Sequence, residues 1–456
     1  MWINAFFSFC LRYLPRVRLM LMVVNNKTVY LLTNFGTYLR SFSPIIVVGE
    51  QIKQLKRNGY EPVLIVSEGW EPPEDSIFHG VETKFTYSFA SHDPKATVED
   101  TEEMVDLAYQ QLNDILPDDA KVFTHDLIFL PDYTILNLAA RRLAADRPTI
   151  SWLHTVHSAT NPETVSRERN MYGEKYAEAL MSPFPNSQIA YPNGYDRRRV
   201  AMNFHFEEDN VIEIPHSTDP TEGLHPLVQR FYDEKLADVE VFIVYPLRLD
   251  RGKYAEADIY LTAGFRKIGV KAHALFCDFQ STGDDKVVYR EDLKKLASDL
   301  DVADRVTFLS EFDDMAMMDV THDIIMDFFT LSNVFLMPSK SETYSLVSQE
   351  AMLRGNLVIM NQDFAPFRQI FGDAALYRQF DGANIAISGM NGEIVTRHGE
   401  NGSGINLYYE GLANEIRYYL EHDTVLKAKT WVRTKRNPDA VFRDYVLPVL
   451  NRKNDA

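Results

Sequence analysis

The stretch that decides the fold covers residues 333–360 and reads NVFLMPSKSETYSLVSQEAMLRGNLVIM. After Asn333, residues 334–337 are apolar and partly β-branched, as in a buried strand, and Pro338 ends that run. A polar turn follows, and the apolar spacing from Leu346 to Leu353 is typical of a helix. After Gly355 comes a second apolar, strand-like run. The stretch therefore predicts a strand, a turn, a helix and another strand, as in an α/β protein.

The start of this helix has the features of an anion site. Its first backbone N–H groups, near Ser345, Leu346 and Val347, have no partner within the helix, and the helix dipole also favours a phosphate there. Glu342 lies just before the helix and Glu350 lies inside it. A carboxylate only accepts hydrogen bonds, so its natural partners beside a bound diphosphate are neutral hydroxyl groups. The pattern favours a sugar-nucleotide site in which one carboxylate serves the sugar and the other the ribose.

A second segment, YPLRLDRGK at residues 245–253, continues the strand-like run Val241–Tyr245. It places Arg248 and Lys253 five residues apart, directly after the predicted strand. Two fixed cations stabilise the growing negative charge of a departing nucleoside diphosphate without a metal ion. The alternative is that both are ordinary surface charges, as most arginines and lysines are.

With Glu342 and Glu350 eight residues apart, the sequence ETYSLVSQEAM resembles the E-x(7)-E motif of the family-four retaining glycosyltransferases, which have the GT-B fold. The segment with Arg248 and Lys253 resembles the G-R-L-x-x-x-K-G segment of that family, whose cations reach the donor pyrophosphate. The resemblance implies an α/β protein with two doubly wound Rossmann-like domains facing a central cleft. It covers the C-terminal half closely and the N-terminal half loosely.

The resemblance also implies individual site residues. The residues implied to be catalytic are His157, Arg248, Lys253 and Glu342. The residues implied to contact the nucleotide sugar are Gly36, Thr37, Arg248, Lys253, Leu309, Ser310, Glu342, Tyr344, Ser345, Leu346, Val347 and Glu350. No metal ion and no cofactor is expected, since the nucleotide-diphosphate sugar is a co-substrate.

Three of these assignments come from weaker matches. The family has F-L-G at a strand end that contacts the base, and the chain has Phe308-Leu309-Ser310, with serine in place of glycine. His157 fits the family's T-x-H beside the reacting sugar better than His154 does, and a structural histidine is the alternative. Gly36 and Thr37 follow a predicted strand, but a single glycine is much weaker than the G-x-G-x-x-G of a nicotinamide site.

The length of 456 residues is too great for one core and suits two domains. We expect an extension at 1–26, an acceptor-side Rossmann-like domain at 27–220 and a nucleotide-sugar domain at 235–425. Residues 426–456 resemble the family's C-terminal helical segment, which crosses back to the first domain. The extension is apolar, but arginines and a proline interrupt it, so it contains no run long enough to span a bilayer and no evident signal peptide.

Composition bears on partners and location. The formal net charge is −18, which repels nucleic acid on average, although basic clusters occur at 197–199 and 427–436. The two cysteines, Cys10 and Cys277, have neither metal nor redox spacing, which fits a reducing cytoplasm. We read the D-x-D sequence at 299–301 as surface and not as a metal site.

The sequence therefore predicts a metal-independent, cytoplasmic hexosyl- or pentosyltransferase that retains the anomeric configuration. Its partners are a nucleotide sugar and an acceptor hydroxyl on a glycan, lipid or small molecule. The alternatives are glycosylation of a hydroxymethylated DNA base, which is less favoured, and a sugar-nucleotide epimerase of the same fold. The loops 70–78 and 161–176 would choose the acceptor. The sequence does not define the sugar, the base, the acceptor or the oligomeric state.

Overall fold

The structure is a computed structural model that describes residues 27–87, 98–158, 178, 181–279, 281, 283–313, 320–340, 342–380, 386–388, 394–396 and 403–452. The predicted extension 1–26 and the predicted acceptor loop 161–176 lie outside the described residues. The chain divides into two compact units. The first comprises the residues up to Ile214 together with those from Leu450, and the second is Pro215–Val449.

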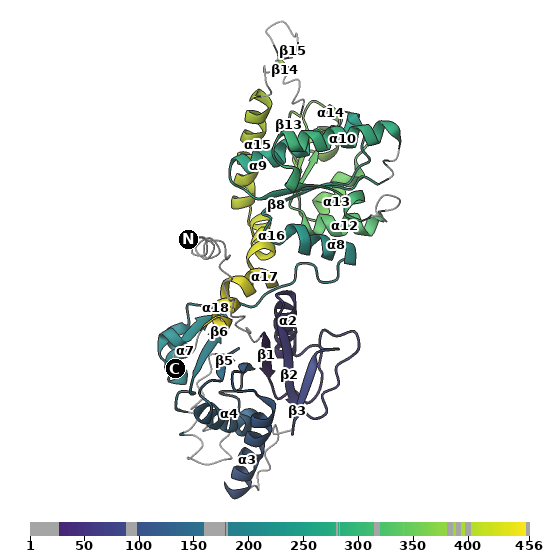
Figure 1. The fold of residues 1–456 in the computed structure, drawn as a ribbon. Helices are drawn as coiled ribbons and strands as arrows, with labels where there is room; N and C mark the ends of the chain where they lie inside the picture. Colours follow the sequence, from purple (N-terminus) through teal and green to yellow (C-terminus); the bar gives the residue numbers. More distant parts are fainter. Residues whose placement is uncertain are drawn as a thin grey trace, which may run out of the picture. The chain divides into compact units, whose positions relative to one another are not determined.

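The first unit is built on a seven-stranded sheet in which all strands are parallel (Figure 1). The strand order is β3-β2-β1-β4-β5-β6-β7. The strands are β1 Thr28–Leu32, β2 Glu61–Ser67, β3 Glu82–Thr86, β4 Lys121–His125, β5 Ser151–Thr155, β6 Ser187–Tyr191 and β7 Val211–Glu213. The helices between them include α2 Ser43–Arg57, α3 Val98–Ile115, α4 Thr134–Asp146 and α7 Arg197–Phe204.

The second unit has a six-stranded, fully parallel sheet of order β10-β9-β8-β11-β12-β13. Its strands are β8 Val241–Tyr245, β9 Ala272–Phe276, β10 Val306–Phe308, β11 Val334–Met337, β12 Leu357–Asn361 and β13 Leu376–Arg378. Its helices include α8 Pro226–Phe231, α9 Glu256–Lys267, α10 Asp284–Asp299, α11 Leu309–Phe312, α12 His322–Leu331, α13 Leu346–Leu353, α14 Ala365–Phe371, α15 Ser403–His422, α16 Thr424–Lys435, α17 Pro438–Val441 and α18 Leu447–Leu450. A small antiparallel pair, β14 Ala386–Ser388 and β15 Ile394–Thr396, completes it.

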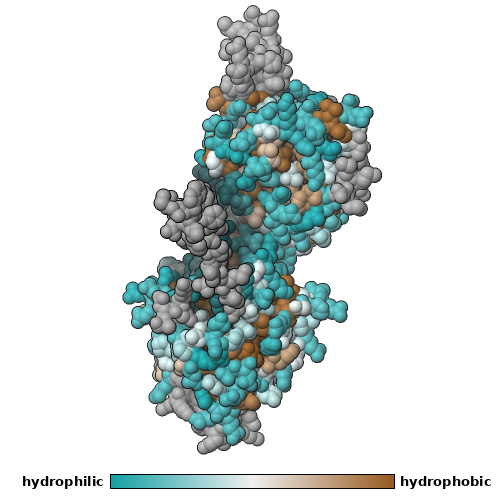
Figure 2. All heavy atoms as spheres, in the orientation of Figure 1, coloured by the Kyte–Doolittle hydropathy of each residue, from teal (hydrophilic) through white to brown (hydrophobic). Residues whose placement is uncertain are grey.

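Both faces of the second sheet are buried. Val241, Ile243 and Tyr245 of β8 belong to one core cluster, which also takes residues from α9, α10 and α15. The alternate residues Phe242 and Val244 belong to another cluster, which takes residues from α8, α12 and α14. Successive side chains of a strand point to opposite faces, so helices on both faces require an apolar residue at every position. The visible surface is mostly hydrophilic, with hydrophobic residues in scattered patches (Figure 2).

This arrangement confirms the predicted fold class, an α/β chain with two doubly wound Rossmann-like domains of the kind that make up the GT-B fold. In each sheet the order reverses beside the first strand, between β1 and β4 and between β8 and β11. Connections leave this reversal point on opposite faces of the sheet, so a crevice forms at the carboxyl ends of the strands. The topology therefore marks one place in each unit where a ligand site is expected.

Two predicted elements are wrong in detail. The sequence predicts a strand at Val306–Ser310, but the strand ends at Phe308, and Leu309 and Ser310 begin the short helix α11. The sequence also predicts one helix from Trp431 to Leu450, but α16 ends at Lys435. Pro438 has no N–H to continue a helix, and the side chain of Asn437 instead accepts a hydrogen bond from the Ala440 N–H at 2.8 Å, which caps α17.

None of the helices in the described ranges combines the length and the apolar character that crossing a membrane requires.

Candidate functional site

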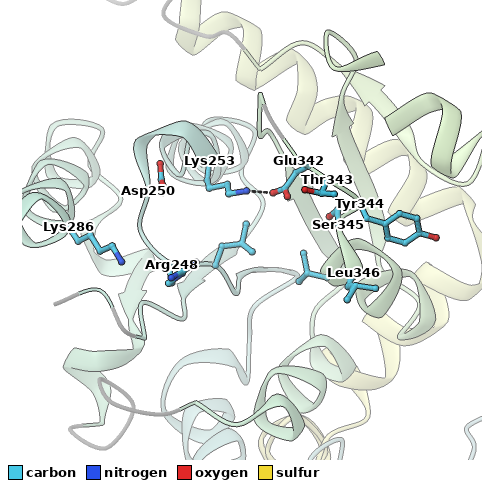
Figure 3. Close-up of a pocket in the computed structure, with 11 residues that line it drawn as sticks. Arg248, Asp250, Lys253, Lys286, Glu342, Thr343, Tyr344, Ser345 and Leu346 are labelled. Atoms are coloured by element: carbon cyan, nitrogen blue, oxygen red, sulfur yellow. Dashed lines mark hydrogen bonds and ion pairs between the residues drawn. The ribbon is translucent and has the colours of Figure 1, made fainter. Parts of the chain in front are cut away.

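A cavity of about 560 Å³ opens beside the carboxyl ends of β8 and β11, at the reversal point of the second sheet (Figure 3). Four residues of the segment 247–253, which follows β8, form one part of its lining, and residues 342–347, which follow β11, form another. The complete lining is Leu247, Arg248, Asp250, Lys253, Lys286, Glu342, Thr343, Tyr344, Ser345, Leu346 and Val347. Side chains far apart in the sequence thus meet where the topology predicts a ligand site.

The N-terminus of α13 lies in this lining. Ser345 is the residue before the helix, and its side chain makes no capping hydrogen bond to the first N–H groups. The Ser345 hydroxyl is instead within 2.7 Å of the Ser348 hydroxyl. The N–H groups of Leu346 and Val347 belong to the first turn, where donors have no acceptor within the helix. An uncapped helix start that lines a cavity offers these donors and the helix dipole to an anion.

The backbone of Ser345 is strained. Its φ of 70° and ψ of 70° place it in the left-handed region, which costs a residue with a Cβ about 1 kcal/mol or more. Ser345 is 8 % exposed. Strain of this kind is held in place by the surrounding structure and is common at ligand sites. Here it turns the chain sharply between Glu342 and α13, so that the loop and the helix start line the same cavity.

Three cations line the cavity. Arg248 and Lys253 come from the loop after β8, and Lys286 comes from the first turn of α10. In Figure 3, Arg248 and Lys286 lie on the side opposite Tyr344 and Leu346. The carboxylate of Asp250 accepts a hydrogen bond from the Gly252 N–H at 2.8 Å, which fixes the turn that carries Lys253. The lining thus has three positive and two negative side chains, which suits a ligand with several negative charges.

The Lys253 ammonium forms an ion pair with the Glu342 carboxylate across the cavity. The side chains are 27 % and 16 % exposed, so both retain some access to solvent. Figure 3 shows these two groups turned toward each other from different loops. Tyr344 and Leu346 are 46 % and 65 % exposed, and they add an apolar surface to the same cavity.

The structure brings most of the site residues predicted in the second half together. Arg248, Lys253, Glu342 and the run Tyr344–Val347 all line the cavity. Glu350 is elsewhere on α13, where its carboxylate accepts a hydrogen bond from His322 Nε2 at 3.0 Å. Its predicted contact with ribose stays a prediction.

Leu309 and Ser310, predicted to contact the nucleotide base, are buried. The Ser310 N–H donates to Asp278 Oδ1 at 3.0 Å, and its hydroxyl donates to Asp278 Oδ2 at 2.6 Å. Arg290 also donates to Asp278 Oδ2, at 2.9 Å. Internal partners therefore already occupy both donors of Ser310. The predicted contact of this backbone with the base stays a prediction.

Three predicted residues lie in the first unit, at the carboxyl edge of its sheet. Gly36 and Thr37 are in the loop after β1, where Gly36 is half-buried and Thr37 exposed. His157 is two residues beyond β5, and its backbone N–H donates to Asp126 Oδ1 at 2.9 Å. His154 lies inside β5 and is buried, with Nδ1 2.8 Å from the Thr124 hydroxyl.

The ring of His157 belongs to a short polar chain. His125 Nε2 lies 3.0 Å from Gln51 Oε1, and His125 Nδ1 lies 3.0 Å from His157 Nε2. An amide oxygen only accepts, so His125 carries its proton on Nε2 and accepts from the Nε2–H of His157. Asp126 adjoins this chain with a φ of 54°, which is unusual for a residue with a side chain. A carboxyl group, two imidazoles and a strained backbone thus gather at the reversal point of the first sheet.

Burial shifts the pKa values of this cluster in opposite directions. It raises the pKa of Asp126 to about 6, because desolvation outweighs the hydrogen bond from the His157 N–H. It lowers the pKa of His157 to about 4, because a charged imidazolium is costly there. At pH 7 His157 is therefore neutral and acts through hydrogen bonds.

These two shifts predict opposite pH dependences. The folded-state pKa of His157 lies below the ordinary value of 6.5, so its contribution to stability is lost as the pH falls from 6.5 to 4. The folded-state pKa of Asp126 lies above 3.8, so its contribution grows as the pH falls from 6 to 4. In Asp126→Asn, acidification from pH 6.5 to 4 should lower the free energy of unfolding by on the order of 2 kcal/mol more than in the wild type. Urea titrations across this range measure it.

His157→Gln is the matched variant, because it removes the imidazole whose pKa is lowered and keeps Asp126, whose pKa is raised. Its stability should rise over the same pH range relative to the wild type. Parallel pH profiles for both variants and the wild type would contradict the assignment.

Lys286 is the cavity cation that the sequence does not identify. It belongs to the connection after β9, and it reaches the cavity because β9 lies beside β8 in the sheet. Two arginines of the basic clusters noted in the sequence hold backbone carbonyls within the fold. Arg197 Nε donates to the Val211 carbonyl at 2.6 Å, and Arg433 is buried and donates to the Val239 carbonyl at 2.8 Å. These two arginines therefore support the backbone.

No protein-family model matches the chain, and no curated protein is similar to it in sequence. Solved structures do match along nearly its full length. A glycosyltransferase from Rickettsia africae ESF-5 has 13 % identity and a TM-score of 0.33, over 94 % of this chain and 99 % of that one. Anabaena HepE in complex with UDP and glucose has 13 % identity and a TM-score of 0.31, over 93 % and 97 %. Sucrose-phosphate synthase from Thermosynechococcus elongatus has 18 % identity and a TM-score of 0.30, over 93 % and 96 %.

Proposed function

We propose that this chain is a retaining glycosyltransferase of the hexosyl- or pentosyltransferase type, which moves a sugar from a nucleoside diphosphate to an acceptor hydroxyl. The observation that carries the proposal is the cavity at the carboxyl ends of β8 and β11. There an uncapped helix start, Arg248 and Lys253 meet the carboxylate of Glu342. Cations and N–H groups suit a diphosphate, and a carboxylate suits the hydroxyls of a sugar.

In this proposal the diphosphate lies against the N–H groups of Leu346 and Val347 and between the cations. Glu342 accepts hydrogen bonds from the sugar, and Glu350 accepts them from the ribose. The bond from the anomeric carbon to the phosphate oxygen breaks, and a bond from that carbon to the acceptor oxygen forms on the same face. The acceptor proton passes to the leaving phosphate. The cations stabilise the charge that develops there.

The first unit is proposed to bind the acceptor. His157 would lie beside the reacting sugar, and Gly36 and Thr37 would contact donor or acceptor. Asp126 supports this role, because a buried carboxyl group with a raised pKa beside two imidazoles is typical of a functional site.

Product analysis tests the proposal. The purified chain is incubated with UDP-glucose, GDP-mannose or ADP-glucose and a panel of glycan, lipid and small-molecule acceptors. We expect release of the nucleoside diphosphate together with a product whose anomeric configuration, measured by NMR, equals that of the donor. An inverted product would refute retention. Conversion of the donor to an epimer without any acceptor would identify an epimerase instead.

Lys286 provides a prediction that does not rest on the sequence resemblance. Lys286→Ala should raise KM for the donor by about tenfold, because a charge-assisted hydrogen bond contributes roughly 1.5 kcal/mol. Steady-state kinetics at saturating acceptor measures this. Lys295 is the matched control, since it is exposed on the same helix outside the lining, and Lys295→Ala should leave KM unchanged. Equal KM values for the two variants would remove Lys286 from the site.

A further inference from the structure

The Lys253–Glu342 ion pair joins two groups that the proposed function assigns to different parts of the donor. Lys253 would bind the diphosphate, and Glu342 would bind the sugar. In the structure the two bind each other (Figure 3). Each must therefore exchange its partner when a donor enters.

The exchange differs for a complete donor and for a nucleoside diphosphate alone. A diphosphate draws Lys253 away from Glu342 and leaves this carboxylate, whose side chain is only 16 % exposed, beside new negative charge without a cation. A carboxylate without a partner in a partly dehydrated site is unfavourable. A nucleotide sugar instead brings hydroxyl groups, which donate to Glu342 as Lys253 turns to the phosphates. Only the complete donor satisfies both ends of the broken pair.

We propose that the Lys253–Glu342 ion pair makes the site discriminate between the sugar-loaded donor and the sugar-free nucleoside diphosphate, an inference that rests on the proposed function. The pair opposes binding of the diphosphate until a sugar engages Glu342. After transfer the sugar has left, so the pair re-forms and weakens the hold on the product. The ion pair therefore favours both binding of the complete donor and release of the nucleoside diphosphate product.

A general electrostatic effect on all anions must be distinguished from this discrimination between donor and diphosphate. Removing any negative charge from the lining strengthens the attraction for every anion. Asp250 offers the comparison, because its carboxylate also lines the cavity but bonds to the Gly252 N–H and not to Lys253. Asp250→Asn should strengthen binding of the diphosphate and of the nucleotide sugar by the same factor. Glu342→Gln, which breaks the Lys253–Glu342 ion pair, should strengthen binding of the diphosphate only.

Titration calorimetry with three matched ligand pairs tests the inference: UDP and UDP-glucose, GDP and GDP-mannose, ADP and ADP-glucose. The comparison uses the diphosphate and the nucleotide sugar of the base that the wild type binds. Glu342→Gln should lower Kd for this diphosphate about fivefold, the scale of a partly exposed ion pair. Kd for the nucleotide sugar should stay equal or rise, because an amide oxygen accepts from sugar hydroxyls more weakly than a carboxylate does. The preference for the complete donor should thus fall about fivefold or more.

Two further variants secure the interpretation. Glu415→Gln removes one carboxylate from the partly buried Arg378–Glu415 ion pair, outside the cavity, and should change neither affinity. In a Lys253→Met background the pair is already broken, so Glu342→Gln should lower Kd for the diphosphate no more than Asp250→Asn does, through the general effect of charge alone.

Equal shifts of both affinities in Glu342→Gln, or no tightening of the diphosphate, would overturn the inference while leaving the proposed function standing. If the wild type bound none of the six ligands, the proposed function would fail and the inference with it.

Discussion

Replacing Lys253 by alanine is expected to lower kcat/KM for sugar transfer about a hundredfold, equivalent to roughly 3 kcal/mol of transition-state stabilisation. Lys253 lines the cavity with Arg248, where negative charge would build on the leaving phosphate as its bond to the sugar breaks. The variant removes one of the fixed charges that stabilise this state. Steady-state measurement of nucleoside diphosphate release with a fixed acceptor gives the effect.

Arg251 is the matched control for this variant, because it lies in the same turn but outside the lining. It pairs with Asp292, and its guanidinium lies 4.5 Å from the centre of the Tyr289 ring. Arg251→Ala should change kcat/KM by no more than about threefold, as expected for an exposed ion pair. A Lys253→Ala enzyme with more than about a third of wild-type activity would show that this ammonium does not stabilise the leaving group.

Gly264→Ala is expected to lower the free energy of unfolding by about 3 to 4 kcal/mol. Gly264 lies on α9 where this helix packs against α15. A Cβ added at Gly264 would lie 2.4 Å from the carbonyl oxygen of Tyr409 and 2.7 Å from its carbonyl carbon. Both are backbone atoms of a helix, so they cannot rotate aside as a side chain does. The helices would have to separate and loosen the core that includes Phe265 and Tyr409.

Gly411→Ala is the control for this substitution. Gly411 is exposed on α15, two residues from Tyr409, and a Cβ there would meet no described atom within 4 Å. Alanine is the better helix former, so this variant should gain about 0.5 to 1 kcal/mol. Chemical denaturation followed by circular dichroism compares the two. Equal stability of both variants would contradict the close contact between α9 and α15.

The sequence predicts the strands best where both faces of a sheet are covered. The apolar run Val241–Tyr245 coincides with β8, because a central strand of a parallel sheet with both faces covered favours apolar residues at every position. The edge strand β3, Glu82–Thr86, carries glutamate, lysine and threonine and is mostly exposed. Its hydrogen bonds to β2 hold it in place, and no apolar run indicates a strand there.

The residues of the candidate site also fall into those that the sequence predicts and those that only the assembled fold brings to the cavity. The helix start at Leu346 and the nearby Glu342 are neighbours in the sequence, so a local pattern of turn and helix predicts them together. Lys286 reaches the cavity only because β9 lies beside β8, which is a property of the strand order. The donors of Ser310 are occupied because Asp278, at the end of β9, lies opposite α11. Contacts between segments that follow different strands depend on the order of the strands in the sheet, and no spacing in the sequence specifies them.

The central claim is that the cavity of the second unit binds a nucleoside diphosphate sugar. Titration calorimetry of the full chain with UDP-glucose, GDP-mannose and ADP-glucose, repeated with Arg248→Ala and Arg251→Ala, tests it most directly. We predict that at least one ligand binds the wild type, that Arg248→Ala weakens this binding about tenfold, and that Arg251→Ala does not change it. Absence of binding for all three ligands, or equal affinity in the wild type and Arg248→Ala, would contradict the claim.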